Sequence, residues 1–445
     1  MKPMAAKYLI TLMLTLPVAL PASAASVSKF LTAEAINWNG KVIDIASQKK
    51  YYKARRGKGI WTSNSGLNKN GLALVRALAR AGDDGLDPKD YLGGFPNQQS
   101  ALKGDNLAAA ELFLSQAFYR FGRDLFAGRT TPAVSEPDIV ISRKKVSRKG
   151  LLNTAAKKGP QAVVNQLRPQ HQQYARLRAL LAKTKKGAKR RQIIVNMERW
   201  RWLPSNLGKN HVLVNQAAFT LEVYQKGRKI DKRRVIIGKT YHKTPMFSHK
   251  IKYSDFNPTW TVPRSIAGNE ILPKLRKDPN YLTKKGYKLH TSWKADAPVM
   301  NPNSVDWQSV RSKNFPFRIV QPAGDKNALG RVKFLFPNRF NVYLHDTPSR
   351  NLFKNKTRAL SHGCIRVEKP LDFATILYGL DGPLSRRKID AIVASRKTTR
   401  VKLRKPVPVH LTYFTVWVSD NGKAVFHKDI YKRDRLVGGI LFGRV

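Results

Sequence analysis

The strongest constraint on the fold is a change in the spacing of apolar residues at residues 183–191. This short stretch is rich in charge and poor in apolar side chains. Before it, apolar residues recur at helical spacing, and after it they alternate with polar residues, as in strands. The sequence therefore predicts an α+β multidomain protein, with an all-helical domain followed by a mainly β domain.

The individual patterns support this division. Helical spacing predicts helices at residues 68–81, 106–126, 162–167 and 174–181. Alternation predicts strands at residues 212–214, 219–224, 234–237, 332–336, 342–344, 409–418 and 424–430. We therefore place the helical domain at residues 25–190 and the β domain at residues 191–445.

A long insertion separates the early strands from the late ones. Residues 244–330 are rich in Pro, Asn, aromatic residues and Lys, and short helical patterns occur within them. An insertion of this length in a compact domain is typical of a lid or a binding loop. The alternative is a surface elaboration without a function of its own.

The N-terminus has the pattern of a secretory signal peptide. Lys2 and Lys7 precede a short apolar run at residues 8–16, and small residues ending at Ala24 suit a cleavage site. The run is shorter than the ~20 residues that span a bilayer, and Pro17 interrupts it, which disfavours an uncleaved anchor. We therefore predict that residues 1–24 are removed and that the mature protein is exported without a transmembrane segment.

The charge is strongly positive, with 83 Lys and Arg against 28 Asp and Glu, a formal net charge of +55. Such a field attracts anionic polymers. An exported protein rarely meets nucleic acid, so anionic envelope polymers or the cell wall are the expected targets. The alternative is a solvated basic surface that only keeps the protein soluble.

Cys364 is the only cysteine, so the chain forms no intrachain disulfide. A free thiol in an oxidising compartment is either inert or used. A working thiol needs a base, and two histidines are candidates. His362 would share a face with Cys364 on an extended segment, whereas His345 ends a predicted strand. Spacing alone does not choose between them.

The neighbours of Cys364 suit acyl transfer. Gly363 allows close approach of the backbone, and the N–H groups of Gly363 and Cys364 are candidate donors to an oxyanion. Ser361 is a candidate to hold an imidazole in one tautomer. Arg366, on the Cys364 face by alternation, is a candidate to bind a substrate carboxylate, or else a structural arginine bonded to loop carbonyls.

Metal or cofactor chemistry has weaker support in the sequence than acyl transfer at Cys364. None of the nine histidines belongs to a Cys-x-x-Cys or His-Glu-x-x-His arrangement. The stretch from Gly324 to Gly330 lacks the Lys-Ser/Thr end of a phosphate-binding loop. We therefore predict neither a metal nor a cofactor.

His345 followed by Ser361-His362-Gly363-Cys364-Ile365-Arg366 resembles the signature of the L,D-transpeptidase catalytic domain. Further stretches resemble the large periplasmic members of that family, at residues 196–202, 257–266 and 327–334 in the catalytic part and at residues 85–91 and 124–129 in their helical scaffold domain. The likeness covers nearly the whole mature chain.

The resemblance implies a function in cell-wall organisation and cell shape. In the family, the cysteine attacks a tetrapeptide stem of peptidoglycan, D-Ala leaves, a thioester forms, and a side-chain amine of a second stem completes a 3→3 cross-link. Carried over, Cys364 is the nucleophile and His345 the general base. The supporting or substrate-binding residues are Ser361, His362, Gly363, Arg366, Tyr343 and Trp260, with residues 244–330 as the substrate cap.

Two matters stay open at this point. The large members usually carry a small peptidoglycan-binding domain before the catalytic domain, and the sequence leaves no room for it between Leu181 and Ile193. The acceptor is a second stem, a free D-amino acid, an outer-membrane protein or water. A catalytically idle wall-binding scaffold protein is the alternative from another functional class.

Overall fold

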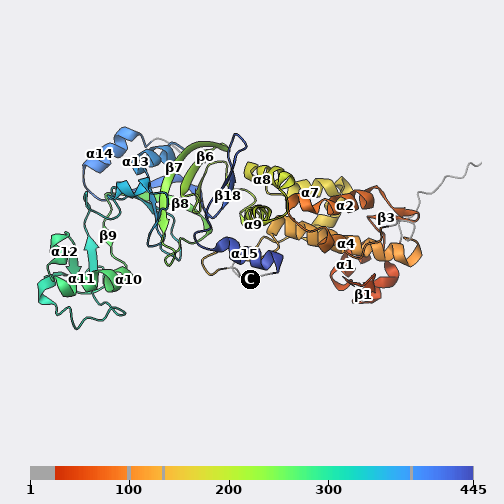
Figure 1. Ribbon diagram of the computed structural model, residues 1–445, viewed down its shortest axis with the longest axis horizontal. Helices are drawn as coiled ribbons and strands as arrows, with labels where there is room; N and C mark the ends of the chain where they lie inside the picture. Colours follow the sequence, from red (N-terminus) through yellow and green to blue (C-terminus); the bar gives the residue numbers. More distant parts are fainter. Residues whose placement is uncertain (1–25, 98–101, 133–135, 381–383, 444–445) are drawn as a thin grey trace, which may run out of the picture. The chain divides into compact units, whose positions relative to one another are not determined.

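The computed structural model describes residues 26–97, 102–132, 136–380 and 384–443 (Figure 1). The predicted signal peptide lies outside these residues. The chain forms two compact units. The helical unit comprises the chain up to Asp124 together with Val146–Leu167, and the catalytic unit comprises Leu125–Lys145 together with Arg168–Val445.

The helical unit is built around α4 (Gly104–Ala127). Phe118 and Phe121, one turn apart on α4, are buried and meet Trp61 and Tyr91 edge-on. The other helices are α1 (Ala46–Ala54), α2 (Lys69–Ala79), α3 (Lys89–Leu92), α6 (Arg148–Lys158) and α7 (Pro160–Leu167). The prediction of an all-helical domain missed two small hairpins, β1 (Ala35–Trp38) with β2 (Lys41–Asp44) and β3 (Thr62–Ser63) with β4 (Gly66–Leu67).

The catalytic unit contains a nine-stranded sheet that closes on itself. Its strands lie in the order β15-β7-β16-β14-β13-β8-β17-β5-β6, and β6 also pairs with β7. The bounds are β5 (His211–Asn215), β6 (Thr220–Gln225), β7 (Arg228–Gly238), β8 (Phe247–Phe256), β13 (Val332–Leu335), β14 (Leu344–His345), β15 (Ala359–Ser361), β16 (Ile365–Val367) and β17 (Thr399–Thr412). The inward side chains form a continuous apolar core, as expected of a barrel-like sheet.

Among the described residues, the sheet is accompanied by the helices α8 (Gln172–Lys183), α9 (Ala188–Trp202), α13 (Pro370–Gly379), α14 (Arg386–Ala394) and α15 (Arg433–Phe442), and by a hairpin of β18 (Val416–Val418) with β19 (Ala424–Phe426). Leu177 and Leu181 of α8 pack with Leu213 and Phe414 of the catalytic unit. The structure therefore does not divide at residue 190, where the change of spacing placed the boundary.

The insertion, which the sequence predicts to be a substrate cap, folds as a separate lobe between β8 and β13 and is called the cap below. It holds a four-stranded sheet of β9 (Trp260–Thr261), β10 (Lys288–His290), β11 (Val299–Met300) and β12 (Arg318–Gln321), with α10 (Arg264–Ile266), α11 (Leu272–Lys277) and α12 (Tyr281–Lys284). Its own apolar cluster includes Leu275 and Trp307. The predicted start of the insertion at Thr244 is wrong, because β8 pairs with β13 and β17 in the main sheet.

Within the described residues, no helix combines the length and the apolar character that a membrane crossing needs.

Candidate active site

The site is built on two neighbouring parallel strands. β14 pairs with β16 so that Leu344 lies opposite Ile365 and His345 opposite Arg366. Leu344 and Ile365 are fully buried in the core. Because side chains alternate along a strand, Tyr343, His345, Cys364 and Arg366 face away from that core. All four line one pocket of about 440 Å³. The structure thus brings the predicted nucleophile, the predicted base and the predicted arginine together.

The loop before Cys364 departs from the extended segment that was predicted. β15 ends at Ser361 and β16 begins at Ile365, and Gly363 between them has a φ of 109°. This backbone region favours glycine. The Gly363 carbonyl accepts from Thr244 Oγ1 at 2.8 Å. His362 and Cys364 therefore lie in a turn between two strands and not on one extended segment. The rule that side chains alternate along a strand does not apply to this pair.

Ser361 holds this turn together. Its hydroxyl accepts from the Gly363 N–H at 3.2 Å and donates to the Cys364 carbonyl at 2.5 Å. Ser361 is buried and bonds to the loop backbone, not to an imidazole as predicted. Since Ser361 already takes the Gly363 N–H, only the Cys364 N–H remains of the two predicted oxyanion donors.

The Cys364 thiol is partly exposed to the pocket. Its sulfur lies 3.8 Å from the Asn341 carbonyl oxygen, and Asn341 adopts a φ of 53° in the turn before β14. Burial raises the pKa of the thiol to about 11, although the N–H and hydroxyl of Tyr343 and the charge of Arg366 act in the opposite direction. At neutral pH the thiol is therefore protonated.

His345 is 5% exposed, and its Nδ1 lies 2.5 Å from the Asp346 carbonyl oxygen. A carbonyl only accepts, so Nδ1 carries the proton and Nε2 keeps a free lone pair. Burial, followed by the charge of Arg366, lowers the pKa of His345 to about 3. The imidazole is therefore neutral at pH 7 and is suited to accept a proton from the thiol at the moment of attack.

Arg366 supplies positive charge beside this pair. Its Nε is buried and has no hydrogen-bond partner among the described residues. The Arg366 side chain as a whole is half-buried and lines the pocket, so its exposed part can meet a ligand that brings an acceptor. This geometry favours the predicted carboxylate-binding role of Arg366 over a structural one.

Part of the pocket lining comes from the cap. Trp260 of β9 lines the pocket, as predicted, and so does Glu270. Glu270 belongs to a π-helical turn, Ala267–Ile271, and its carboxylate binds Nε2 of His362. His242 adds a second imidazole, 5.1 Å from His362 between ring centres. Sequence reasoning missed Glu270, since nothing in its local pattern distinguishes it from other acidic residues of the cap.

We expect the reactivity of Cys364 to rise steeply with pH. With a thiol pKa near 11, the alkylation rate with iodoacetamide should increase about tenfold per pH unit between about pH 7 and pH 10. A cysteine-containing peptide, which levels off near pH 8.5, is the control. A rate that is already constant at pH 7 would indicate a preformed thiolate–imidazolium pair and contradict this description of the site.

In the part of the chain that the structure describes, no three His, Cys, Asp or Glu side chains group as metal ligands would. The fold and the pocket together describe a barrel-like domain in which a cysteine and a histidine line one pocket, with an inserted lobe contributing to the same lining.

Comparison with known families agrees with this class. Residues 209–408 match the model of the L,D-transpeptidase catalytic domain, and residues 46–181 match the model of the scaffold domain. A protein of Haemophilus influenzae named "Putative L,D-transpeptidase" is 39% identical over 246 residues. That match covers 55% of this chain and 48% of the relative, so the chain spans about half the length of this relative.

Solved structures of L,D-transpeptidases are also found. The enzyme from Mycobacterium smegmatis is 12% identical, with a TM-score of 0.22, over 46% of this chain and 58% of that chain. The carbamoyl enzyme of Ldtfm with avibactam is 11% identical, with a TM-score of 0.22, over 46% of this chain and 49% of that chain. Scores this low add nothing to the assignment. On the two family matches, the chain belongs to the L,D-transpeptidase family, with a scaffold domain before the catalytic domain.

Proposed function

We propose that the protein is a peptidoglycan L,D-transpeptidase that forms 3→3 cross-links in the periplasm. One observation carries the proposal: the β14–β16 pairing places His345 and Cys364 on the wall of one pocket, with Arg366 beside them. Family membership supplies the substrate class, the peptide stems of the cell wall. Export follows from the signal peptide predicted at residues 1–24.

In the first step His345 Nε2 takes the proton of the Cys364 thiol as the sulfur attacks the carbonyl carbon before D-Ala. The Cys364 N–H is the candidate donor to the oxyanion, and Arg366 binds a carboxylate of the stem. When the carbon–nitrogen bond breaks, the imidazolium returns its proton to the departing amine. D-Ala leaves, and a thioester joins the stem to Cys364.

In the second step an amine of another stem attacks the thioester. His345 takes the amine proton, an amide bond forms, the carbon–sulfur bond breaks, and the thiolate recovers the proton. The acceptor approaches as an ammonium and releases one proton to solvent before its neutral amine attacks. Glu270 is the single carboxylate among the described residues that line the pocket. We therefore assign Glu270 to attract the acceptor ammonium, with His362 holding its carboxylate in place.

Analysis of muropeptides tests this function. Purified wall rich in tetrapeptides is incubated with the wild type and with Cys364→Ala, then digested and examined by mass spectrometry. Cysteine-dependent 3→3 dimers support the proposal. Loss of D-Ala without dimers would assign an L,D-carboxypeptidase, and incorporation of a D-amino acid or of a protein N-terminus would assign another acceptor. No change with either protein would favour an idle wall-binding scaffold.

We expect Glu270→Gln to separate the two steps. Without the carboxylate, the apparent KM for the acceptor should rise about tenfold, while release of D-Ala from the donor continues, since neutralising one partner of an ion pair loses roughly that factor. Asp296→Asn, an exposed carboxylate of the cap outside the pocket, is the matched control. An equal loss in both steps would show that Glu270 only positions the cap.

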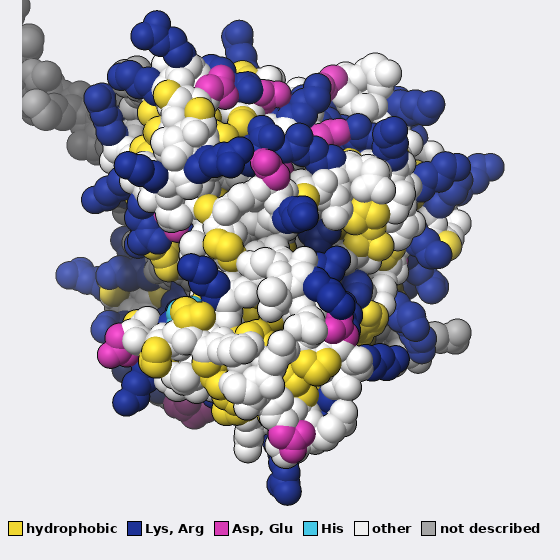
Figure 2. All heavy atoms as spheres, turned by 90° about the vertical axis from the view of Figure 1, so that its left-hand side faces the viewer, with side chains coloured by type: hydrophobic (Ala, Val, Ile, Leu, Met, Phe, Trp, Pro, Cys, Tyr) yellow, Lys and Arg dark blue, Asp and Glu magenta, His cyan; other side chains and the backbone are white. Residues whose placement is uncertain are grey.

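The basic surface is proposed to hold the enzyme near anionic wall or envelope polymers. Figure 2 shows Lys and Arg side chains spread over the face in view, with few Asp and Glu among them. Binding of Cys364→Ala to purified sacculi should fall steeply between about 0.1 M and 1 M salt, where the screening length shrinks from ~10 Å to ~3 Å. Binding that does not respond to salt would contradict this role.

A further inference from the structure

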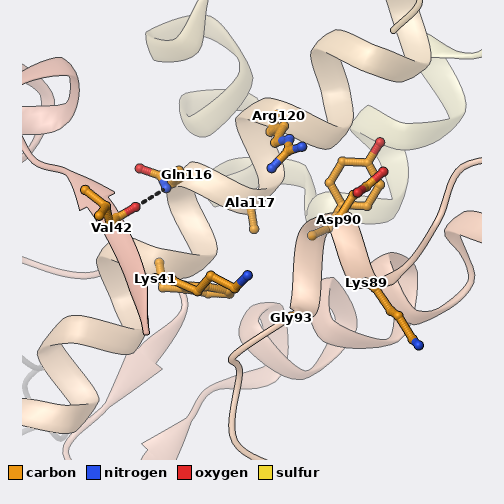
Figure 3. Close-up of a pocket in the computed structure, with 10 residues that line it drawn as sticks. Lys41, Val42, Lys89, Asp90, Gly93, Gln116, Ala117 and Arg120 are labelled. Atoms are coloured by element: carbon orange, nitrogen blue, oxygen red, sulfur yellow. Dashed lines mark hydrogen bonds between the residues drawn. The ribbon is translucent and has the colours of Figure 1, made fainter. Parts of the chain in front are cut away.

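The helical unit contains a pocket of about 330 Å³ that the proposed reaction does not use. Its floor is a stripe of α4 in which Phe113, Gln116, Ala117 and Arg120 follow one another at helical spacing. β2 and α3 form the other walls (Figure 3). The pocket therefore joins three elements of one compact unit.

The walls of this pocket are fixed by hydrogen bonds. The Gln116 amide accepts from the Asp44 N–H at 2.8 Å and donates to the Val42 carbonyl at 3.0 Å, which ties α4 to β2. Tyr91 is buried and donates to Asp124 Oδ2 at 3.1 Å. A site whose walls are held in this way is formed before a ligand arrives.

Two cations extend into the pocket, Lys41 from the β2 wall and Arg120 from the α4 floor (Figure 3). The Lys41 side chain lies against Gly94, where an added Cβ would come within 2.8 Å of Lys41 Cγ. The Arg120 guanidinium lies 6.0 Å from the centre of the Tyr91 ring. Within the described residues, no hydrogen bond or ion pair involves either side chain, so both keep their donors available for a ligand.

The lining favours an organic anion. Lys41, Lys89 and Arg120 line the pocket together with Asp90, the single carboxylate among the described lining residues, so positive charge is in excess. A carboxylate joined to a carbon skeleton suits this lining better than inorganic phosphate does, because apolar side chains lie beside the cations. Phe113, Ala117 and Tyr91 offer an apolar floor to the carbon atoms that accompany the carboxylate.

We propose that this pocket of the scaffold domain binds a carboxylate-bearing peptide, with Arg120 and Lys41 as its anion ligands. The inference rests on the proposed function in naming the source, which is a peptide stem of the wall that the catalytic unit modifies. A second stem-binding site on the same chain raises the effective concentration of polymeric substrate around the enzyme without adding any contact at the catalytic pocket.

Labelling of Lys41 tests the site directly. Full-length Cys364→Ala protein is treated with an amine-acetylating reagent, and acetylation of Lys41 is measured by peptide mass spectrometry. A synthetic tetrapeptide stem should slow this modification severalfold, while the same peptide with every carboxylate amidated should not. Lys50, an exposed lysine of the same unit outside the pocket, is the internal control. Equal protection of both lysines, or none, would overturn the proposal.

Calorimetry with the same peptide provides the second measurement. Lys41→Gln with Arg120→Gln should weaken one binding event at least tenfold, whereas the charge-matched control Lys50→Gln with Arg76→Gln should not. If inorganic phosphate competes as well as the peptide does, the pocket is a general anion site and the assignment to peptides fails. Cross-linking of soluble muropeptides by the wild type is assayed in parallel. If the wild type cross-links muropeptides but the peptide does not bind at the pocket, this inference is wrong and the proposed function stands. If the wild type neither cross-links muropeptides nor binds the peptide, the proposed function is wrong as well.

Discussion

Cys364→Ala is expected to release no measurable D-Ala from tetrapeptide stems, a loss on the order of 10⁴-fold or more, because no other group in the pocket replaces the nucleophile. The fold should survive, since the side chain is partly exposed and its sulfur bonds to the turn at Asn341 and Tyr343, not to the apolar core. The measurement is the rate of D-Ala release, with a thermal unfolding curve to show that the variant is intact.

The two histidines provide the matched comparison. His345→Ala should lose about 10²- to 10⁴-fold, which is the usual contribution of a general base. His362→Ala should lose less, because its Nε2 is already bound to Glu270 and is not free to take the thiol proton. A larger loss at His362 than at His345 would reverse the assignment of the base, and turnover by Cys364→Ala above about 1% would remove the nucleophile from the mechanism.

The second large effect is expected in the scaffold domain. Glu111 of α4 is fully buried and accepts from the Ile60 and Trp61 N–H groups at 2.7 and 2.8 Å, and from the hydroxyls of Tyr52 and Thr62 at 2.7 and 3.0 Å. Glu111→Ala leaves these buried donors without an acceptor, so the free energy of unfolding of this unit should fall by about 3–5 kcal/mol.

Calorimetric unfolding of the full chain measures this change, since two compact units need not unfold in one transition. Glu34→Ala is the control. Glu34 is exposed and lies 3.6 Å from Lys49, so its removal should cost less than about 1 kcal/mol. A change below about 1 kcal/mol for Glu111→Ala would show that the donors find other partners and that Glu111 does not organise the helical unit.

Local patterns predicted the strongly amphipathic elements well. The helix predicted at residues 106–126 agrees with α4 within two residues at each end, because an apolar stripe on a long helix leaves a clear period. The pairing of Arg366 with Cys364 on one face was also correct, since both sit on β16 or at its edge.

The helix α9, which is stabilised by buried ion pairs, was not predicted in full. The charged stretch at residues 183–191 served as the predicted division between the two domains, yet α9 begins at Ala188 within it. α9 shows no apolar face because it is buried on several sides and pairs its charges there, Arg199 with Asp434 and Arg201 with Glu198. Periodicity of apolar residues has no means of detecting such a helix.

Geometry within the site depended on information that spacing does not contain. The choice between His345 and His362 turns on the parallel pairing of β14 with β16 and on the positive φ of Gly363. The strand pairing is a property of the sheet topology, and the positive φ is a property of a single turn. Glu270 reaches the pocket only because the cap folds as its own lobe between β8 and β13.

The central claim is that the stem becomes covalently attached to Cys364. Intact-protein mass spectrometry after brief incubation of the wild type with a disaccharide tetrapeptide tests it most directly. We predict a gain in mass equal to the substrate minus D-Ala, absent from Cys364→Ala and removed by hydroxylamine, which cleaves thioesters. A gain of the same mass on Cys364→Ala, or cross-links that accumulate while the adduct never forms on the wild type, would contradict the mechanism.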